Sequence, residues 1–139
     1  MSTKTTMNSQ ESIRYGYKRT LDMSLPQALE RTREALKKEG FGVLFEIDMK
    51  EKFKEKLGVE FTHYVILGAC NPSLAYQTLQ QEMDIGLLLP CNVIAYEQGG
   101  QSIVAAIDAQ TMMTVVGNPQ LEAAAGEVSE RLRRAIENL

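Results

Sequence analysis

The sequence has few of the residues that build metal and nucleophilic sites. Among 139 residues it contains one histidine, two cysteines and no tryptophan. A closed four-ligand zinc site would therefore need carboxylates or a second chain to complete it. Two cysteines are also far fewer than a disulfide-stabilised secreted scaffold uses, so both are expected to be free thiols in a reducing compartment.

Long apolar segments and a positive net charge are missing as well. No run of about eighteen apolar residues occurs, and residues 1–11 lack the apolar core of a signal peptide. We therefore expect a cytoplasmic protein with no membrane association. Eighteen acidic side chains outnumber fifteen basic ones, which gives a net charge of −3 and no overall basic field for nucleic acid.

Apolar residues, in contrast, are plentiful. They make up 44% of the chain, which is enough to bury a core, and the length corresponds to one domain. Residues 1–11 are expected to form a flexible tail and residues 12–139 the domain.

Hydrophobic periodicity and capping residues predict the elements of this domain. In the strand expected after the first helix, Phe41, Val43, Phe45 and Ile47 alternate with other residues and are expected on one face. The predicted strands span residues 12–21, 41–47, 62–69, 92–97 and 102–108. The predicted helices span residues 25–39, 48–57, 72–83 and 119–139.

Two motifs give the most specific signal. Residues 64–72 read Tyr-Val-Ile-Leu-Gly-Ala-Cys-Asn-Pro, and residues 88–97 read Leu-Leu-Pro-Cys-Asn-Val-Ile-Ala-Tyr-Glu, with Ala75 on the helix between them. In these motifs residues 12–139 resemble the bacterial and archaeal family called domain of unknown function 302. The resemblance implies an α+β fold with helices on one face of a single, largely antiparallel sheet, similar to the saddle of the TATA-binding protein. It also implies a homodimer, and it implies no established activity or cofactor.

The likeness to a DNA-binding saddle does not by itself predict DNA binding, because a fold hosts many functions. The net charge of −3 argues against it, and so does the lack of a basic stripe on any predicted strand. We expect no nucleic-acid partner. The motifs and the resemblance assign neither an enzymatic nor a non-enzymatic role.

The cysteines are the leading site candidates. Cys70 directly precedes Asn71, the expected helix cap, and Pro72, the expected first helical residue. Free N–H groups at a helix start can lower the pKa of a thiol and can hold an anion. If the strands that end at Cys70 and begin near Cys91 pair antiparallel, the two thiols meet.

The leading hypothesis is a pocket formed where the Cys70-Asn71-Pro72 corner meets Pro90-Cys91-Asn92. Its ligand would be small and either anionic or thiophilic. Lys52, on the short predicted helix, is a further candidate for binding an anion.

Two alternatives use the same cysteines differently. In the first, Cys70 is an activated thiolate and Cys91 its resolving partner, or both bind a soft metal such as copper together with Met112 and Met113. In the second, the cysteines only pack, and the protein is a subunit of an assembly.

The one histidine is not expected to join this site. His63 stands seven residues before Cys70 on the same predicted strand. That offset separates the two side chains by about 23 Å and points them to opposite faces of the sheet. Without a base next to a cysteine or serine, acyl-transfer catalysis is disfavoured.

Overall fold

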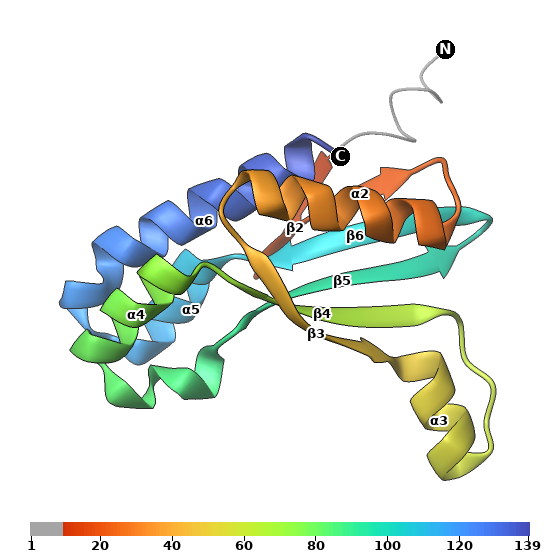
Figure 1. The fold of residues 1–139 in the computed structure, drawn as a ribbon, viewed down its shortest axis with the longest axis horizontal. Helices are drawn as coiled ribbons and strands as arrows, with labels where there is room; N and C mark the ends of the chain where they lie inside the picture. Colours follow the sequence, from red (N-terminus) through yellow and green to blue (C-terminus); the bar gives the residue numbers. More distant parts are fainter. Residues whose placement is uncertain (1–9) are drawn as a thin grey trace.

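The computed structural model describes residues 10–139, which build a six-stranded sheet and the helices around it (Figure 1). The strands lie in the order β1-β2-β6-β5-β4-β3, and each neighbouring pair is antiparallel. They are β1 (Gln10–Ile13), β2 (Gly16–Leu21), β3 (Gly42–Asp48), β4 (Tyr64–Cys70), β5 (Cys91–Gln98) and β6 (Gln101–Ile107). The expected α+β class with an antiparallel sheet is confirmed.

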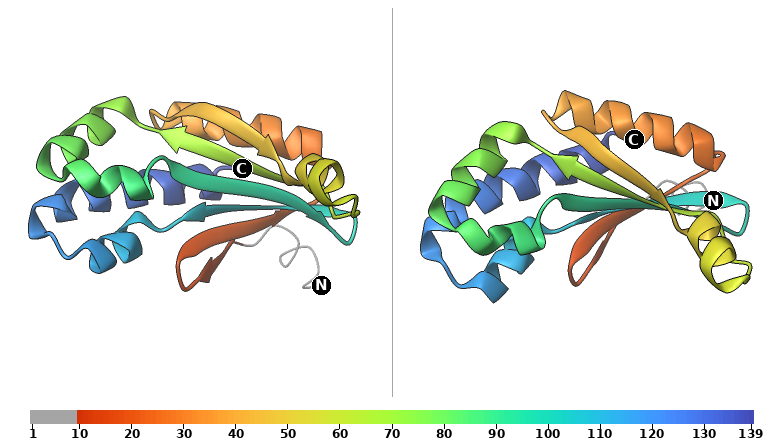
Figure 2. Two further views of the ribbon diagram at one scale, coloured as in Figure 1. Left: turned by 90° about the horizontal axis from the view of Figure 1, so that it is seen from below. Right: turned by 60° about the horizontal axis from the view of Figure 1, so that its bottom comes forward.

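Two long helices, α2 (Leu25–Lys38) and α6 (Glu122–Glu137), cover one face of the sheet (Figure 2). The helix α3 (Met49–Leu57) lies at one end of the sheet, and the other helices gather at the opposite end. These are α4 (Pro72–Gln81), the 3₁₀ helices η1 (Met83–Leu88) and η2 (Pro119–Leu121), and α5 (Ala109–Val116). We call the two sides of the sheet the helix-covered face and the open face.

The tail expected over residues 1–11 falls mainly outside the described residues. Positions 1–9 are not described, whereas Gln10 and Glu11 belong to β1. Among residues 10–139, no helix is long and apolar enough to cross a membrane.

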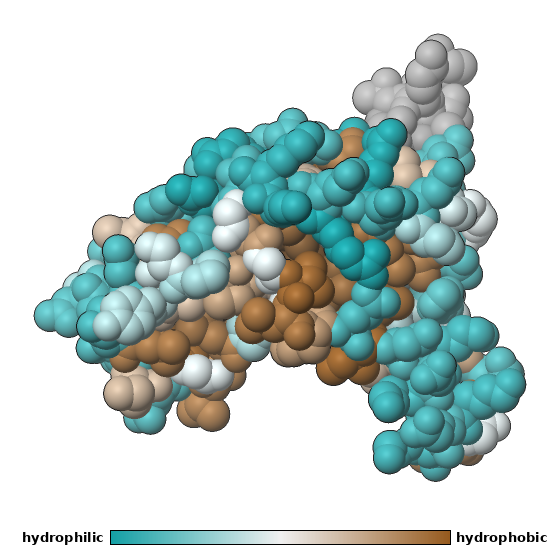
Figure 3. All heavy atoms as spheres, in the orientation of Figure 1, coloured by the Kyte–Doolittle hydropathy of each residue, from teal (hydrophilic) through white to brown (hydrophobic). Residues whose placement is uncertain are grey.

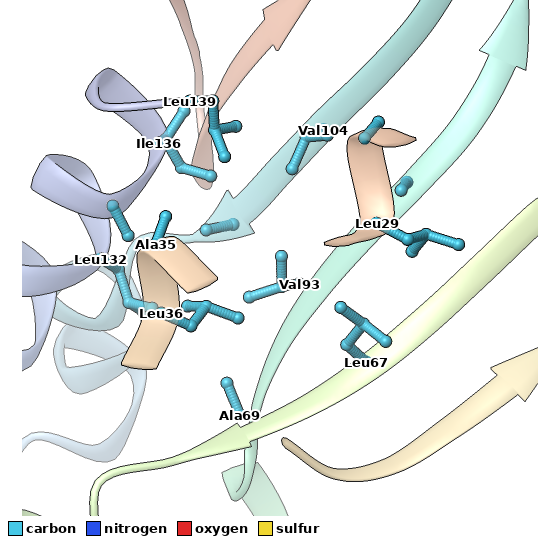
Figure 4. Close-up of a cluster of buried hydrophobic side chains, with 14 of the residues drawn as sticks. Leu29, Ala35, Leu36, Leu67, Ala69, Val93, Val104, Leu132, Ile136 and Leu139 are labelled. Carbon is cyan, nitrogen blue, oxygen red and sulfur yellow. The ribbon is translucent and has the colours of Figure 1, made fainter. Parts of the chain in front are cut away.

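The core lies between the helix-covered face and the two long helices (Figure 4). Leu67 of β4, Val93 of β5 and Val104 of β6 are fully buried there. They lie on the side of the sheet that faces Leu36 of α2 and Leu132 of α6. Each such side chain stabilises the fold by about 1.5–3 kcal/mol relative to an exposed one. This packing fixes the sheet on the helices and so fixes the strand ends that form the site.

The helix starts follow the predicted caps. The Ser24 hydroxyl accepts a hydrogen bond from the Gln27 amide, and the Gln27 side chain accepts one from the Ser24 amide. At the start of α4, Oδ1 of Asn71 accepts a hydrogen bond from the Leu74 amide at 3.2 Å. The chain therefore turns out of β4 and into α4 directly after Cys70.

Two elements differ from the sequence prediction. The strand expected over residues 12–21 is a hairpin, with β1 and β2 joined at Arg14 and Tyr15, and no glycine or proline occupies those two turn positions to indicate the break. No element was predicted between residues 108 and 119, whereas the structure has α5 there. The Asp108 side chain caps this helix by accepting from the Gln110 amide, and Gly117 ends it with φ 72°.

The predicted faces of the strand at residues 41–47 are wrong. A bulge at Leu44 shifts the register of β3, so Val43 lies opposite Ala69 while Phe45 lies opposite Gly68. Val43 therefore points to the helix-covered face and Phe45 to the open face. The extra residue, Leu44, is 64% exposed.

Candidate functional site

The two cysteine motifs meet at one end of the sheet. Cys70 is the last residue of β4, Cys91 is the first residue of β5, and Ala69 lies directly opposite Cys91 in the antiparallel ladder. The expected antiparallel pairing of these strands is confirmed. Both cysteines are free thiols, Cys70 half-buried and Cys91 buried.

A cavity of about 70 Å³ opens at this corner, and both cysteines line it. A single water molecule needs about 10–15 Å³ of such space, so the cavity has room for a small ligand. The elements β4, β5, β6, α4, η1, α5, η2 and α6 all contribute to its wall. Besides the cysteines, the wall includes Ala75, Leu88, Met112 and Met113.

The cavity wall is almost entirely apolar. Its two polar side chains besides the thiols, Asn71 and Thr78, already bond to the backbone of α4. The Thr78 hydroxyl donates to the Leu74 carbonyl at 2.6 Å. Within residues 10–139 the wall contains no charged side chain. An anion in this cavity would lose its hydration without gaining a charged partner, which is strongly unfavourable.

The thiols are not activated in the way that the helix start suggested. Burial raises the pKa of the Cys70 thiol. Burial, and then the neighbouring Cys70 thiol, raise the pKa of Cys91 to about 11. The expected lowering of the pKa is therefore not found, because loss of hydration in an apolar corner disfavours the thiolate.

Three of the predicted site residues lie elsewhere. Pro72 is exposed in the first turn of α4 and does not line the cavity, and Asn92 points to the open face of the sheet. Lys52 is exposed on α3, which follows the far end of β3. Since β3 begins opposite Cys70, its length alone separates Lys52 from the cysteines by about 20 Å. Lys52 therefore cannot join a ligand site at the cysteines.

The histidine stays apart from the cysteines, as expected. Its Nε2 atom lies 3.5 Å from Oδ2 of Asp48, at the end of the sheet remote from the cavity. In the described part of the chain, no three histidine, cysteine, aspartate or glutamate side chains are close enough to share a metal ion.

The part of the site that sequence reasoning missed is the wall formed by α5. This helix brings Met112 and Met113 to the cavity that the cysteines line. A signal was present in the sequence, because Asp108 is a favourable helix cap and Gly117 a favourable helix end.

A second feature is the open face of the sheet, which carries apolar and aromatic side chains. Ring stacking joins Tyr64 of β4 to Tyr96 of β5, whose centroids lie 5.3 Å apart. Ile66 lies opposite both Ile94 and Ile47 on the same face. Apolar surface also lines the hollow between α3 and the opposite end of the molecule (Figure 3). We define the open-face patch as Phe45, Ile47, Tyr64, Ile66, Ile94 and Tyr96.

Comparison with known proteins gives consistent results. The family described as domain of unknown function DUF302 matches residues 17–139. A crystal structure of an uncharacterized conserved DUF302 protein from Bacillus stearothermophilus is similar, with a TM-score of 0.84 and 30% sequence identity. The similarity covers 91% of this chain and 98% of that chain. No curated protein matches the sequence.

Proposed function

The chain belongs to the family described as domain of unknown function DUF302, and we propose that it is a homodimeric binding protein whose ligand occupies the cysteine-lined cavity. The observation that carries this proposal is the cavity itself. It lies where the two motifs meet, and side chains from eight separate elements line it. Concave, mostly apolar sites with a few polar groups are the usual location of small-ligand binding.

The character of the wall limits the ligand to a small, uncharged or thiophilic species. An engineered cavity of about 150 Å³ holds benzene, whereas this cavity measures about 70 Å³. Apolar side chains favour an uncharged ligand, and the thiols of Cys70 and Cys91 favour one with affinity for sulfur. The anionic ligand that was expected as an alternative gains no support, because no charged side chain of residues 10–139 lines the cavity.

The homodimer is supported by the open-face patch. Helices α2 and α6 cover the opposite face, so within residues 10–139 this apolar surface has no equivalent helical layer. Contiguous apolar surface is typical of interaction sites, and identical copies related by twofold symmetry are the commonest partners. A second chain placed on this patch would bury Tyr64 and Ile66 of the middle strand β4 near the centre of the interface.

Xenon binding, followed by the NMR signals of the methionine methyl groups, tests the cavity. The Met112 and Met113 signals should shift with xenon pressure, and that of Met83, which is 78% exposed and outside the cavity, should not. Ala75→Leu fills the cavity with a residue that favours helix and should abolish the shifts. Ala123→Leu, at an exposed position of α6, is the matched control and should respond like the wild type. Wild-type Met112 and Met113 signals that ignore xenon would contradict the proposal.

A further inference from the structure

Four sulfur-containing side chains line the same cavity. The chain has two cysteines and seven methionines in total, and Cys70, Cys91, Met112 and Met113 all belong to the cavity wall. They come from three places in the sequence: the end of β4, the start of β5, and α5.

Strand pairing explains why these four residues line one cavity. Ala69 lies opposite Cys91, so the β4 and β5 cysteines are close across the ladder. On the other side, Val93 pairs with Ala106 of β6. Continuing that register by two residues brings Cys91 level with Asp108, the cap of α5. Met112 and Met113 follow within the next turns of this helix.

The chemistry of the wall selects one class of ligand among those that bind sulfur. Thiolate and thioether groups are soft ligands, which favour Cu(I) over the hard cations that prefer carboxylates and water. The wall offers no carboxylate, imidazole or amine from residues 10–139. A Cu(I) ion bound to one thiolate is electrically neutral, which suits an apolar enclosure better than a divalent ion does.

We infer that the cavity binds one Cu(I) ion through sulfur atoms of Cys70 and Cys91 and of the Met112 and Met113 thioethers. This inference rests on the proposed function, since it names a ligand for the same cavity. On binding, one cysteine thiol gives its proton to the solvent and forms a Cu–S bond as the thiolate. The thioethers add neutral Cu–S contacts, and neither copper nor sulfur changes its oxidation state.

The test is an anaerobic titration of the reduced, full-length protein with Cu(I), in competition with the chromophoric chelator bicinchoninate. The wild type should take one Cu(I) per chain. Replacing both cysteines by serine, or both Met112 and Met113 by leucine, should lower the affinity at least about tenfold. Leucine has nearly the volume of methionine, so the second variant removes the thioethers and preserves the packing. Met83→Leu changes an exposed methionine outside the cavity and should bind Cu(I) like the wild type.

Copper X-ray absorption gives an independent reading of the ligands, and sulfur alone should surround the ion. Failure of the wild type to compete with the chelator would overturn the inference. So would an unchanged affinity of the Met112→Leu/Met113→Leu variant, or nitrogen and oxygen ligands in the absorption spectrum. If xenon binds the cavity while Cu(I) does not, the copper inference fails and the proposed cavity function stands. If neither binds, both fail.

Discussion

Cys91 lies directly opposite Ala69 in the ladder between β4 and β5, and this pairing places it next to Cys70, although α4 and η1 separate the two cysteines in the sequence. The neighbouring thiol then acts on Cys91 in addition to burial, and both raise its pKa. The corner is thus built from two strand ends, and helices contribute most of the rest of its apolar wall. Its properties are those of an apolar binding site with unionised thiols at neutral pH.

The first prediction concerns stability at alkaline pH. An unfolded cysteine titrates near the reference pKa of 9.0, whereas folded Cys91 titrates near 11. Between these values the unfolded chain has lost a proton that the folded chain keeps, so the contribution of Cys91 to the free energy of unfolding falls as pH rises. From pH 8 to pH 10.5 the loss should be about 2 kcal/mol.

Cys91→Ala isolates this contribution, because lysine and tyrosine titrations are common to both proteins. Urea unfolding at a series of pH values should show the stability advantage of the wild type over Cys91→Ala shrinking above pH 9. Cys70→Ala is the matched control and should show a smaller change, since Cys70 is much less buried than Cys91. An advantage of the wild type that stays constant with pH would show that Cys91 titrates normally.

The second prediction concerns the bulged edge of the sheet. The Phe45 ring lies over Gly68, and a β-carbon at position 68 would overlap it. Gly68→Ala should therefore displace the ring and cost about 1–2 kcal/mol of stability. In a Phe45→Ala background the same change should be neutral or slightly stabilising, because glycine inside a strand is itself unfavourable.

A double-mutant cycle in urea or thermal unfolding measures this coupling. A coupling of about 1 kcal/mol or more between positions 45 and 68 is expected. If Gly68→Ala lowers the free energy of unfolding equally in both backgrounds, contact with the Phe45 ring is not the reason for glycine at position 68.

The third prediction concerns assembly through the open-face patch. Light scattering should give about 31 kDa for the wild type, twice the chain mass of 15.5 kDa. Ile94→Glu places a charge within the patch, where a second chain would bury it, and should give 15.5 kDa. Leu57→Glu alters a 69% exposed residue at the end of α3, outside the patch, and should leave the mass at 31 kDa. A wild type of 15.5 kDa would rule out the homodimer.

The sequence predicted those features that depend on neighbouring residues. Helix α2 followed from an apolar stripe and the Ser24 cap, and α4 followed from Asn71 and Pro72. The β1–β2 hairpin was not predicted, because its turn at Arg14 and Tyr15 contains no residue that marks a turn. The placement of Val43 and Phe45 on different faces of β3 depends on a bulge, which only pairing with β4 reveals.

The same distinction explains the outcome for the site. The proximity of Cys70 and Cys91 was predicted correctly. The two residues were expected at strand ends, so the prediction needed only the assumption that β4 and β5 pair antiparallel. Lys52 was chosen as a binding residue because its positive charge suits an anion. The length of β3 places it at the other end of the sheet from the cysteines. The opposite direction of the cysteine pKa shifts depends on burial by α4, α5 and α6, which only the folded arrangement supplies.

The most direct test of the central claim, that the cysteine-lined cavity is a ligand site, is native mass spectrometry of freshly purified protein. The account predicts an additional bound mass on the wild type and on Ala123→Leu, and its absence from Ala75→Leu, whose longer side chain fills the cavity. Bare chains of 15.5 kDa, or their bare dimers, in all three proteins would contradict it.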